Sequence, residues 1–233
     1  MAERVKRRGR RRTYDADGTR AAITAAAASS FAEHGYHGAS VDTIANLARC
    51  NKSLVFQYFG SKEALYTAVL ADADEKLAGL LERSMAPILP GRSPGIDQGR
   101  FTGFLRSLLG AFFDYVVENP QFARIMAWEQ AAQWKVFRGL ASRFEPRDLP
   151  RLEEVFDEAR RAGHLRGGVD SVMLTTLALQ MCWTVSASIP LYEQLLPVKE
   201  RSQLLAHLKE QIVDLLAAGA LRRGTASPSD TRP

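Results

Sequence analysis

The chain has 233 residues, 46% of them hydrophobic, which is enough to bury a substantial core in one or two domains. Lys and Arg number 31 against 26 Asp and Glu, a formal net charge of +5 that is unevenly distributed. The segment 3–12 holds seven cations and one anion, so the rest of the chain carries a net charge of −1. Such a basic run favours a polyanionic partner, with nucleic acid ahead of an anionic membrane surface.

Several protein classes are excluded by simple patterns. No stretch approaches the roughly 20 consecutive apolar residues of a membrane-spanning helix, and no apolar segment follows the basic N-terminus as it would in a signal peptide. The two cysteines, Cys50 and Cys182, are too far apart for a disulfide framework or a zinc spacing. We therefore expect a cytoplasmic protein that does not associate with membranes.

Helical patterns follow one another, and no run of alternating β-branched residues indicates a strand. Four helices are predicted in the first 85 residues, at 19–35, 40–48, 52–59 and 62–85. Three of them begin beside a side chain suited to the N-cap position, namely Ser40, Asn51 and Ser61. The segment 86–100 holds three prolines and three glycines and predicts a loop.

Further helices are predicted in the second half of the chain, at 101–118, 120–133, 150–163, 172–185 and 199–218. Asp170 is the expected N-cap of the apolar helix 172–185, and Pro190 and Pro197 are expected to delimit it. Four regions follow from these patterns: a basic arm (1–18) and a tail (225–233), both expected to be disordered, and between them two helical regions, 19–66 and 67–224.

The two short helices at 40–48 and 52–59 are joined by a three-residue turn, which is typical of a helix-turn-helix. At 100° per residue, Val55 and Phe59 share one side of the second helix and are expected to pack against the first. Ser53 and Gln57 lie on the opposite side. A helix with a small or amide-bearing outer face suits the reading of base edges in the major groove.

The segment FAEHGYHGASVDTIANLARCNKSLVFQYFGSKEALYTAVL, within roughly 19–70, resembles the TetR family of bacterial transcriptional regulators. The phenylalanine before the Glu-x-Gly-Tyr run, the Thr-Ile-Ala of the first motif helix and the Tyr-Phe-Gly-Ser-Lys-Glu-Ala-Leu block carry the resemblance. It implies an all-α homodimer with an N-terminal three-helix DNA-binding domain (19–66) and a variable C-terminal domain (67–224) for ligand binding and dimerisation. It also implies a repressor that a small effector releases from a pseudo-palindromic operator.

The chain departs from the family pattern at three positions. Arg49 stands where a glycine is usual in the turn, Leu54 cannot donate a hydrogen bond to a base, and Phe56 replaces a tyrosine that commonly touches phosphate. Lys62 is retained, at a helix N-terminus that favours phosphate. The candidate DNA-binding residues are Ser40, Thr43, Asn51, Lys52, Ser53, Leu54, Phe56, Gln57, Tyr58 and Lys62, with Arg7, Arg8, Arg10, Arg11 and Arg12 of the arm.

Bulky side chains are dense between residues 101 and 137, and the polar groups among them suit a ligand pocket. The alternative is that these aromatic residues are ordinary core. The candidate pocket residues are Phe104, Leu108, Phe112, Phe122, Met126, Trp128, Glu129, Gln133, Trp134, Phe137, Leu177, Gln180, Met181 and Thr184. The effector is expected to be small and largely apolar.

The apolar helix 172–185 and the leucine-rich last helix have more hydrophobic surface than a small monomer needs, which favours a four-helix dimer interface. The candidate interface residues are Val172, Leu179, Trp183, Leu204, Leu208, Ile212 and Leu215.

No constellation indicates an enzyme, and no catalytic residue, metal ligand or cofactor is predicted. His34 and His37 have a His-x-x-His spacing but lie on either side of Gly35 at a helix end, where a surface or capping role is favoured. Two other interpretations remain open. The C-terminal half could bind a protein partner instead of a small molecule, or the basic arm could hold the chain at a membrane surface, although the latter does not explain the motif at 40–62.

Overall fold

The computed structural model describes residues 16–88, 96–140, 149–197 and 200–222. Within these ranges the protein is all-α, with an isolated β-bridge between Leu165 and Leu221. The helices are α1 (Ala16–Gly38), α2 (Val41–Leu47), α3 (Lys52–Phe59), α4 (Lys62–Met85), α5 (Gln98–Glu118), α6 (Pro120–Ala131), α7 (Lys135–Leu140), α8 (Leu149–Arg161), α9 (Ser171–Ala187), α10 (Ile189–Leu195) and α11 (Arg201–Ala220). No single helix of the described chain has the length and apolar character needed to cross a membrane.

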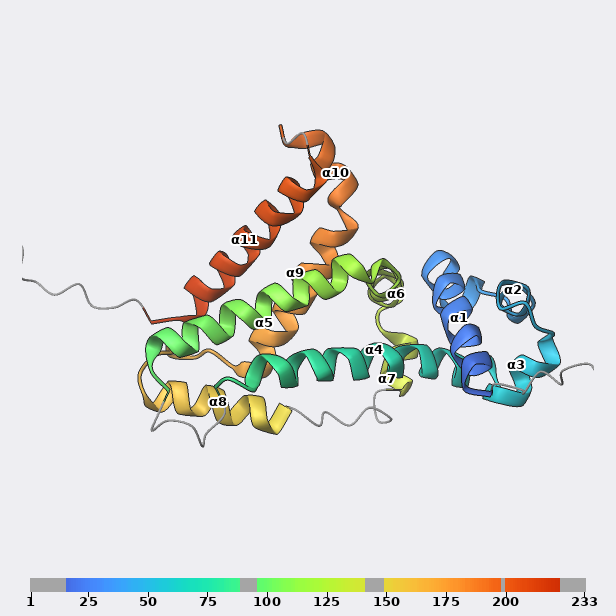
Figure 1. Ribbon diagram of the computed structural model, residues 1–233, viewed down its shortest axis with the longest axis horizontal. Helices are drawn as coiled ribbons and strands as arrows, with labels where there is room; N and C mark the ends of the chain where they lie inside the picture. Colours follow the sequence, from blue (N-terminus) through green and yellow to red (C-terminus); the bar gives the residue numbers. More distant parts are fainter. Residues whose placement is uncertain (1–15, 89–95, 141–148, 198–199, 223–233) are drawn as a thin grey trace, which may run out of the picture.

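Helices α1–α3 form one end of the molecule, and α4 runs from this end along the rest (Figure 1). Helix α5 lies over α4; α9 crosses α5, and α11 extends on the side of α5 away from α4. Helix α6 follows α5 across a sharp turn at Asn119 and comes to lie between the main helical body and α1. The predicted DNA-binding domain therefore contacts the rest of the protein, which we call the body, through α4 and α6.

The predicted N-caps are confirmed. The hydroxyl of Ser40 accepts hydrogen bonds from the backbone of α2, and Asn51 Oδ1 accepts one from Leu54 N at 2.7 Å. Ser61 and Asp170 cap α4 and α9 in the same way, at 3.0 and 2.7 Å. Each such bond satisfies an amide that the helix leaves free and contributes about 1 kcal/mol.

Some helix boundaries differ from the prediction. Helix α1 begins at Ala16 rather than Thr19, and Gly35 interrupts it with φ 67° and ψ 176° before a final turn that ends at Gly38. Helix α5 begins at Gln98, because Asp97 caps it by accepting from Arg100 N at 2.9 Å. Helix α10 was not predicted: Pro190 lies in its first turn, where the missing N–H is not needed.

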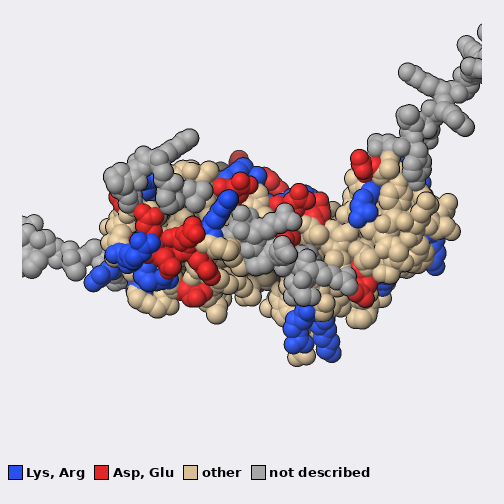
Figure 2. Space-filling model, turned by 90° about the horizontal axis from the view of Figure 1, so that it is seen from below, with Lys and Arg blue, Asp and Glu red and all other residues tan. Residues whose placement is uncertain are grey.

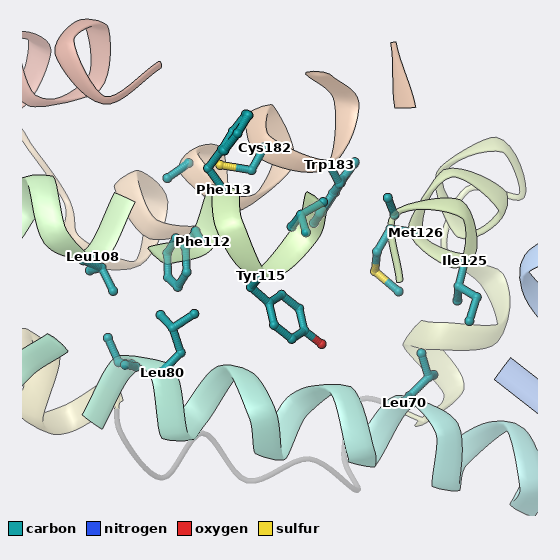
Figure 3. Packing of buried hydrophobic residues seen from close by; sticks show 14 of the residues in the cluster. Leu70, Leu80, Leu108, Phe112, Phe113, Tyr115, Ile125, Met126, Cys182 and Trp183 are labelled. Carbon is teal, nitrogen blue, oxygen red and sulfur yellow. The ribbon is translucent and has the colours of Figure 1, made fainter. Parts of the chain in front are cut away.

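The core of the helical body lies where α4, α5, α6 and α9 meet. Figure 3 shows Leu80 on α4 facing Phe112 on α5, while Cys182 and Trp183 of α9 approach from the other side of α5. Most of the predicted aromatic cluster is packed here: Phe101 and Phe112 are at most 3% exposed, and Phe101 meets the ring of Phe156 of α8 edge to face at 5.6 Å.

The turn between α2 and α3 contains Arg49 in the left-handed backbone region, with φ 54°. The arginine thus adopts the left-handed conformation that a glycine would adopt without strain. The departure from the family pattern lies in the type of residue and not in the conformation of the turn. The turn is closed by hydrogen bonds from Arg49 N to Asn46 O and from Cys50 N to Ala45 O, at 3.1 and 2.9 Å.

We expect Arg49→Gly to raise the free energy of unfolding by up to about 1 kcal/mol, since relief of the left-handed strain outweighs the added freedom of the unfolded chain. The control is Arg49→Ala, which removes the same exposed side chain and keeps the strain. Urea unfolding of both variants measures the difference. A glycine variant less stable than the alanine variant would contradict this interpretation.

Candidate nucleic-acid interface

Helices α2 and α3 pack as the sequence predicts. Ile44 is fully buried in α2, and Val55 and Phe59 are 2% and 9% exposed in α3. Arg20 of α1 supports α3 from outside, with its guanidinium 4.6 Å from the centre of the Phe59 ring and Nη1 donating to Tyr58 O at 3.3 Å. The second helix of the motif is therefore held by apolar burial on one side and by a cation on its C-terminal turn.

The opposite side of α3 faces outward. Ser53 and Gln57 are exposed, and Phe56 is 40% exposed. Leu54 is only half-exposed, and Tyr58 turns its hydroxyl inward, where it is buried without a hydrogen-bond partner among the described residues. Ser53, Phe56 and Gln57 are thus the exposed, uncharged DNA-binding candidates of α3.

Two cations of the motif have partners within the chain. Lys52 Nζ lies 2.8 Å from Asp42 Oδ2 and links the starts of α3 and α2. Lys62 Nζ donates to His37 O at 3.3 Å and lies 4.9 Å from the centre of the Tyr36 ring. Burial lowers the pKa of Lys62 below its usual value. These internal contacts therefore hold both ammonium groups beside the helix-turn-helix in the DNA-free protein.

The end of the molecule formed by α1–α3 has few charges. Figure 2 shows this end, at the right of the view, as mostly neither acidic nor basic. The sequence between residues 13 and 66 contains four cations and five anions. The arginines of the arm, Arg7, Arg8, Arg10, Arg11 and Arg12, lie outside the described residues.

The candidate pocket residues do not surround one cavity. Phe104, Leu108, Phe112 and Met126 are packed in the core. Four others are exposed on the surface: Trp128, Gln133, Leu177 and Thr184. Phe122, Trp134, Phe137, Gln180 and Met181 are half-buried.

A groove of about 690 Å³ lies elsewhere, between the first part of α1, the middle of α4 and the α5–α6 turn. Its walls include many alanines, such as Ala25 and Ala68, and its rim carries Asp17 and Glu75. Phe122 is the one candidate pocket residue that lines it.

The candidate dimer residues separate into two groups. Trp183, Leu204 and Ile212 are at most 6% exposed inside the chain itself, so their assignment to an interface was wrong: they lie on the inner faces of α9 and α11. Leu179 and Leu208 are half-buried. Val172 and Leu215 are exposed, and they are joined on α9 and α10 by apolar side chains that the sequence analysis did not assign to the interface, namely Met173, Leu177, Leu191 and Leu195.

The junction between α6 and the predicted DNA-binding end, which is formed by α1–α3, involves contacts that sequence reasoning missed. Trp128 Nε1 donates to Ala32 O of α1 at 3.3 Å. The indole ring lies against Gly35, where a Cβ would be only 3.0 Å from Trp128 Cδ2. Glu129, expected to line a pocket, is 2% exposed and accepts a hydrogen bond from the Tyr66 hydroxyl at 2.7 Å. No local pattern links these positions, which lie 63 or more residues apart.

Metal chemistry has no visible basis in the described residues, where no three His, Cys, Asp or Glu side chains are grouped to hold an ion. The chain instead matches the models of a family of regulatory proteins. Residues 23–69 match the model of the bacterial regulatory proteins of the tetR family, and residues 103–225 match the tetracyclin repressor-like C-terminal domain. The chain belongs to the TetR family.

Individual relatives are similar over part of the chain. The transcriptional repressor SCO4008 of Streptomyces coelicolor is 34% identical over 49% of this chain and 51% of its own length. The transcriptional activator FasR of Mycolicibacterium smegmatis is 28% identical over 54% of this chain and 57% of its own length. The chain thus spans about half the length of these curated relatives. The crystal structure of SCO4942 from Streptomyces coelicolor matches with a TM-score of 0.58 and 26% identity, over 87% of this chain and 98% of that one.

Proposed function

We propose that this TetR-family protein is a ligand-responsive transcriptional regulator that binds a pseudo-palindromic operator as a homodimer. The observation that carries the proposal is the outer face of α3, where Ser53, Phe56 and Gln57 are accessible on a helix capped by Asn51. An amide side chain suits adenine, and an aromatic edge suits the thymine methyl group. Lys52 and Lys62 flank this face and are available to contact phosphates, which fixes the register of the helix on DNA.

Repression is the output that we favour. SCO4008 is named as a transcriptional repressor, and FasR as an activator. In the proposed mechanism the protein occupies its operator and a small, largely apolar effector releases it. Release requires only that the effector bind the DNA-bound and the free conformations with different affinities.

The half-buried Phe122 and Trp134, together with the buried Trp183, are the proposed contacts of the effector. Trp134 lies 6.1 Å from Trp183, which lies 6.3 Å from Phe122, measured between ring centres. The indole N–H of Trp183 is buried and has no hydrogen-bond partner among the described residues. A ligand with an apolar body and one hydrogen-bond acceptor would satisfy this donor.

A second candidate function keeps DNA binding and replaces the small molecule by a protein partner. The dense packing of Phe104, Leu108 and Phe112 favours it, because these positions leave no room for a ligand. A screen of small apolar compounds for release of the protein from its DNA separates the two functions.

Homodimerisation is proposed through the exposed apolar side chains of α9, α10 and α11. Leu177, Leu195 and Leu215 are 48%, 66% and 66% exposed, so a partner would remove a large apolar area from water. A two-fold dimer presents two copies of α3 and therefore recognises two inverted half-sites.

We expect Gln57→Ala to relax the preference at one or two base pairs of each half-site by about 1–3 kcal/mol, because the bidentate amide contact is lost. Binding of the variant to operator duplexes with single substitutions measures the loss at each position. Gln121→Ala, which removes an exposed amide of α6, is the matched control. A variant that weakens every duplex by the same factor would remove Gln57 from base recognition.

Deletion of residues 3–12 should flatten the dependence of log K on log salt concentration by about 0.9 for each phosphate that the arm neutralises. A full-length variant with glutamine at Arg7, Arg8, Arg10, Arg11 and Arg12 should behave in the same way. Titrations at four or more salt concentrations give the slopes. Equal slopes for the deletion variant and the wild type would show that the arm does not contact DNA.

We expect Leu215→Glu to shift the protein from dimer to monomer, because a carboxylate would be desolvated at the centre of an apolar interface. Sedimentation velocity at micromolar concentration measures the distribution. The control is Gln98→Glu, which adds a carboxylate at the exposed start of α5. Dimers of unchanged stability in Leu215→Glu would place the interface on another surface.

A further inference from the structure

Tyr66 and Glu129 form a buried polar joint between the DNA-binding end and the body. Tyr66 is 1% exposed, and its ring lies 4.8 Å from the Phe31 ring and 5.1 Å from the Tyr36 ring, so it is embedded among α1 residues of the DNA-binding end. Its hydroxyl donates to Glu129 Oε1 of α6 at 2.7 Å. Burial and the hydrogen bond to Glu129 raise the pKa of Tyr66, so the phenol remains a donor at physiological pH.

The second oxygen of the same carboxylate holds the chain that follows α6. Glu129 Oε2 accepts from Phe137 N of α7 at 3.0 Å, and Glu129 O accepts from Trp134 N at 2.7 Å. The intervening residues Gln133 and Trp134 both have left-handed backbones, with φ 57° and 59°. This conformation reverses the chain so that the amide of Phe137 meets the carboxylate. A single side chain therefore connects the DNA-binding end, α6 and the start of α7.

The joint restricts how the DNA-binding end turns relative to the body. Trp128, the residue next to Glu129, contacts α1 at Ala32 and Gly35 on one side, while Glu129 contacts Tyr66 on the other. A carboxylate that is nearly inaccessible to water has few alternative partners, so rotation at this point breaks hydrogen bonds that solvent cannot replace.

We propose that the Tyr66–Glu129 hydrogen bond sets the separation of the two α3 helices and thereby selects the spacing between operator half-sites. This inference rests on the proposed function, in which a dimer reads two half-sites. One base pair advances the duplex by roughly 3.4 Å, so a small rotation of each DNA-binding end changes the spacing that fits. The two residues act as positioning residues, since neither reaches the outer face of α3.

The test uses the full-length protein and an operator that the wild type selects from random duplexes. Its half-sites are then moved together or apart by one and two base pairs, and fluorescence anisotropy gives Kd for each duplex. Tyr66→Phe keeps the ring and removes the hydroxyl. We expect it to reduce the ratio of Kd values between the poorest and the best spacing by roughly three- to tenfold.

Glu129→Gln is the conservative variant. Its amide oxygen can accept from Phe137 N and its amide nitrogen can donate to the Tyr66 oxygen, so the spacing preference should be retained. The double variant Tyr66→Phe with Glu129→Gln keeps an acceptor for Phe137 N and removes the buried charge that Tyr66→Phe leaves without its donor, so it should recover part of the stability lost in Tyr66→Phe. Its spacing preference should nevertheless remain relaxed, which separates positioning from folding.

Phe156→Leu provides the matched control for stability, since it weakens the core at α8 and does not touch the joint. If Tyr66→Phe weakens binding to the duplexes of every spacing by the same factor, as this control should, the inference is overturned and the pair only stabilises the fold. If the wild type itself binds all spacings equally, the proposed paired half-sites fail, and the inference fails with them.

Discussion

The close approach of α6 to α1 determines how the two parts of this protein are connected. It depends on Gly35, which interrupts α1 with a positive φ and has no Cβ, so the indole of Trp128 can lie directly against the backbone. Any larger residue at this position would meet both a strained backbone and the Trp128 ring. Because Trp128 is held here, Glu129 is brought to Tyr66, and α6 is held against the DNA-binding end.

The features that the sequence predicted well are local ones. N-caps need only a suitable side chain beside a periodic helix, and Ser40, Asn51 and Asp170 all act as predicted. The helix-turn-helix was also predictable, since its burial pattern repeats over fewer than twenty residues. Pro190 was expected to delimit the helix 172–185, and α9 does end just before it, at Ala187; α10 was missed because a proline can also begin a new helix.

The features that the sequence predicted poorly depend on contacts between distant segments. Trp183 and Ile212 lie on helices that are apolar on more than one side, so hydrophobicity alone does not show which side faces the body and which faces solvent. The sequence suggested that Glu129 is a polar group lining a pocket. In the structure its partner is the buried Tyr66, 63 residues earlier in the chain. A buried carboxylate needs hydrogen-bond donors, but the sequence does not indicate which element supplies them.

The internal partners of Lys52 and Lys62 have a consequence for the thermodynamics of association. A free lysine side chain gives up about 2 kcal/mol of rotamer entropy when it is immobilised. Here much of that ordering has already occurred on folding, because Asp42 and His37 O hold the two ammonium groups beside the motif. A phosphate that arrives exchanges one partner for another instead of ordering a mobile chain. Ordering these two side chains should therefore add little to the entropic penalty of complex formation, while the release of counterions from the DNA favours it.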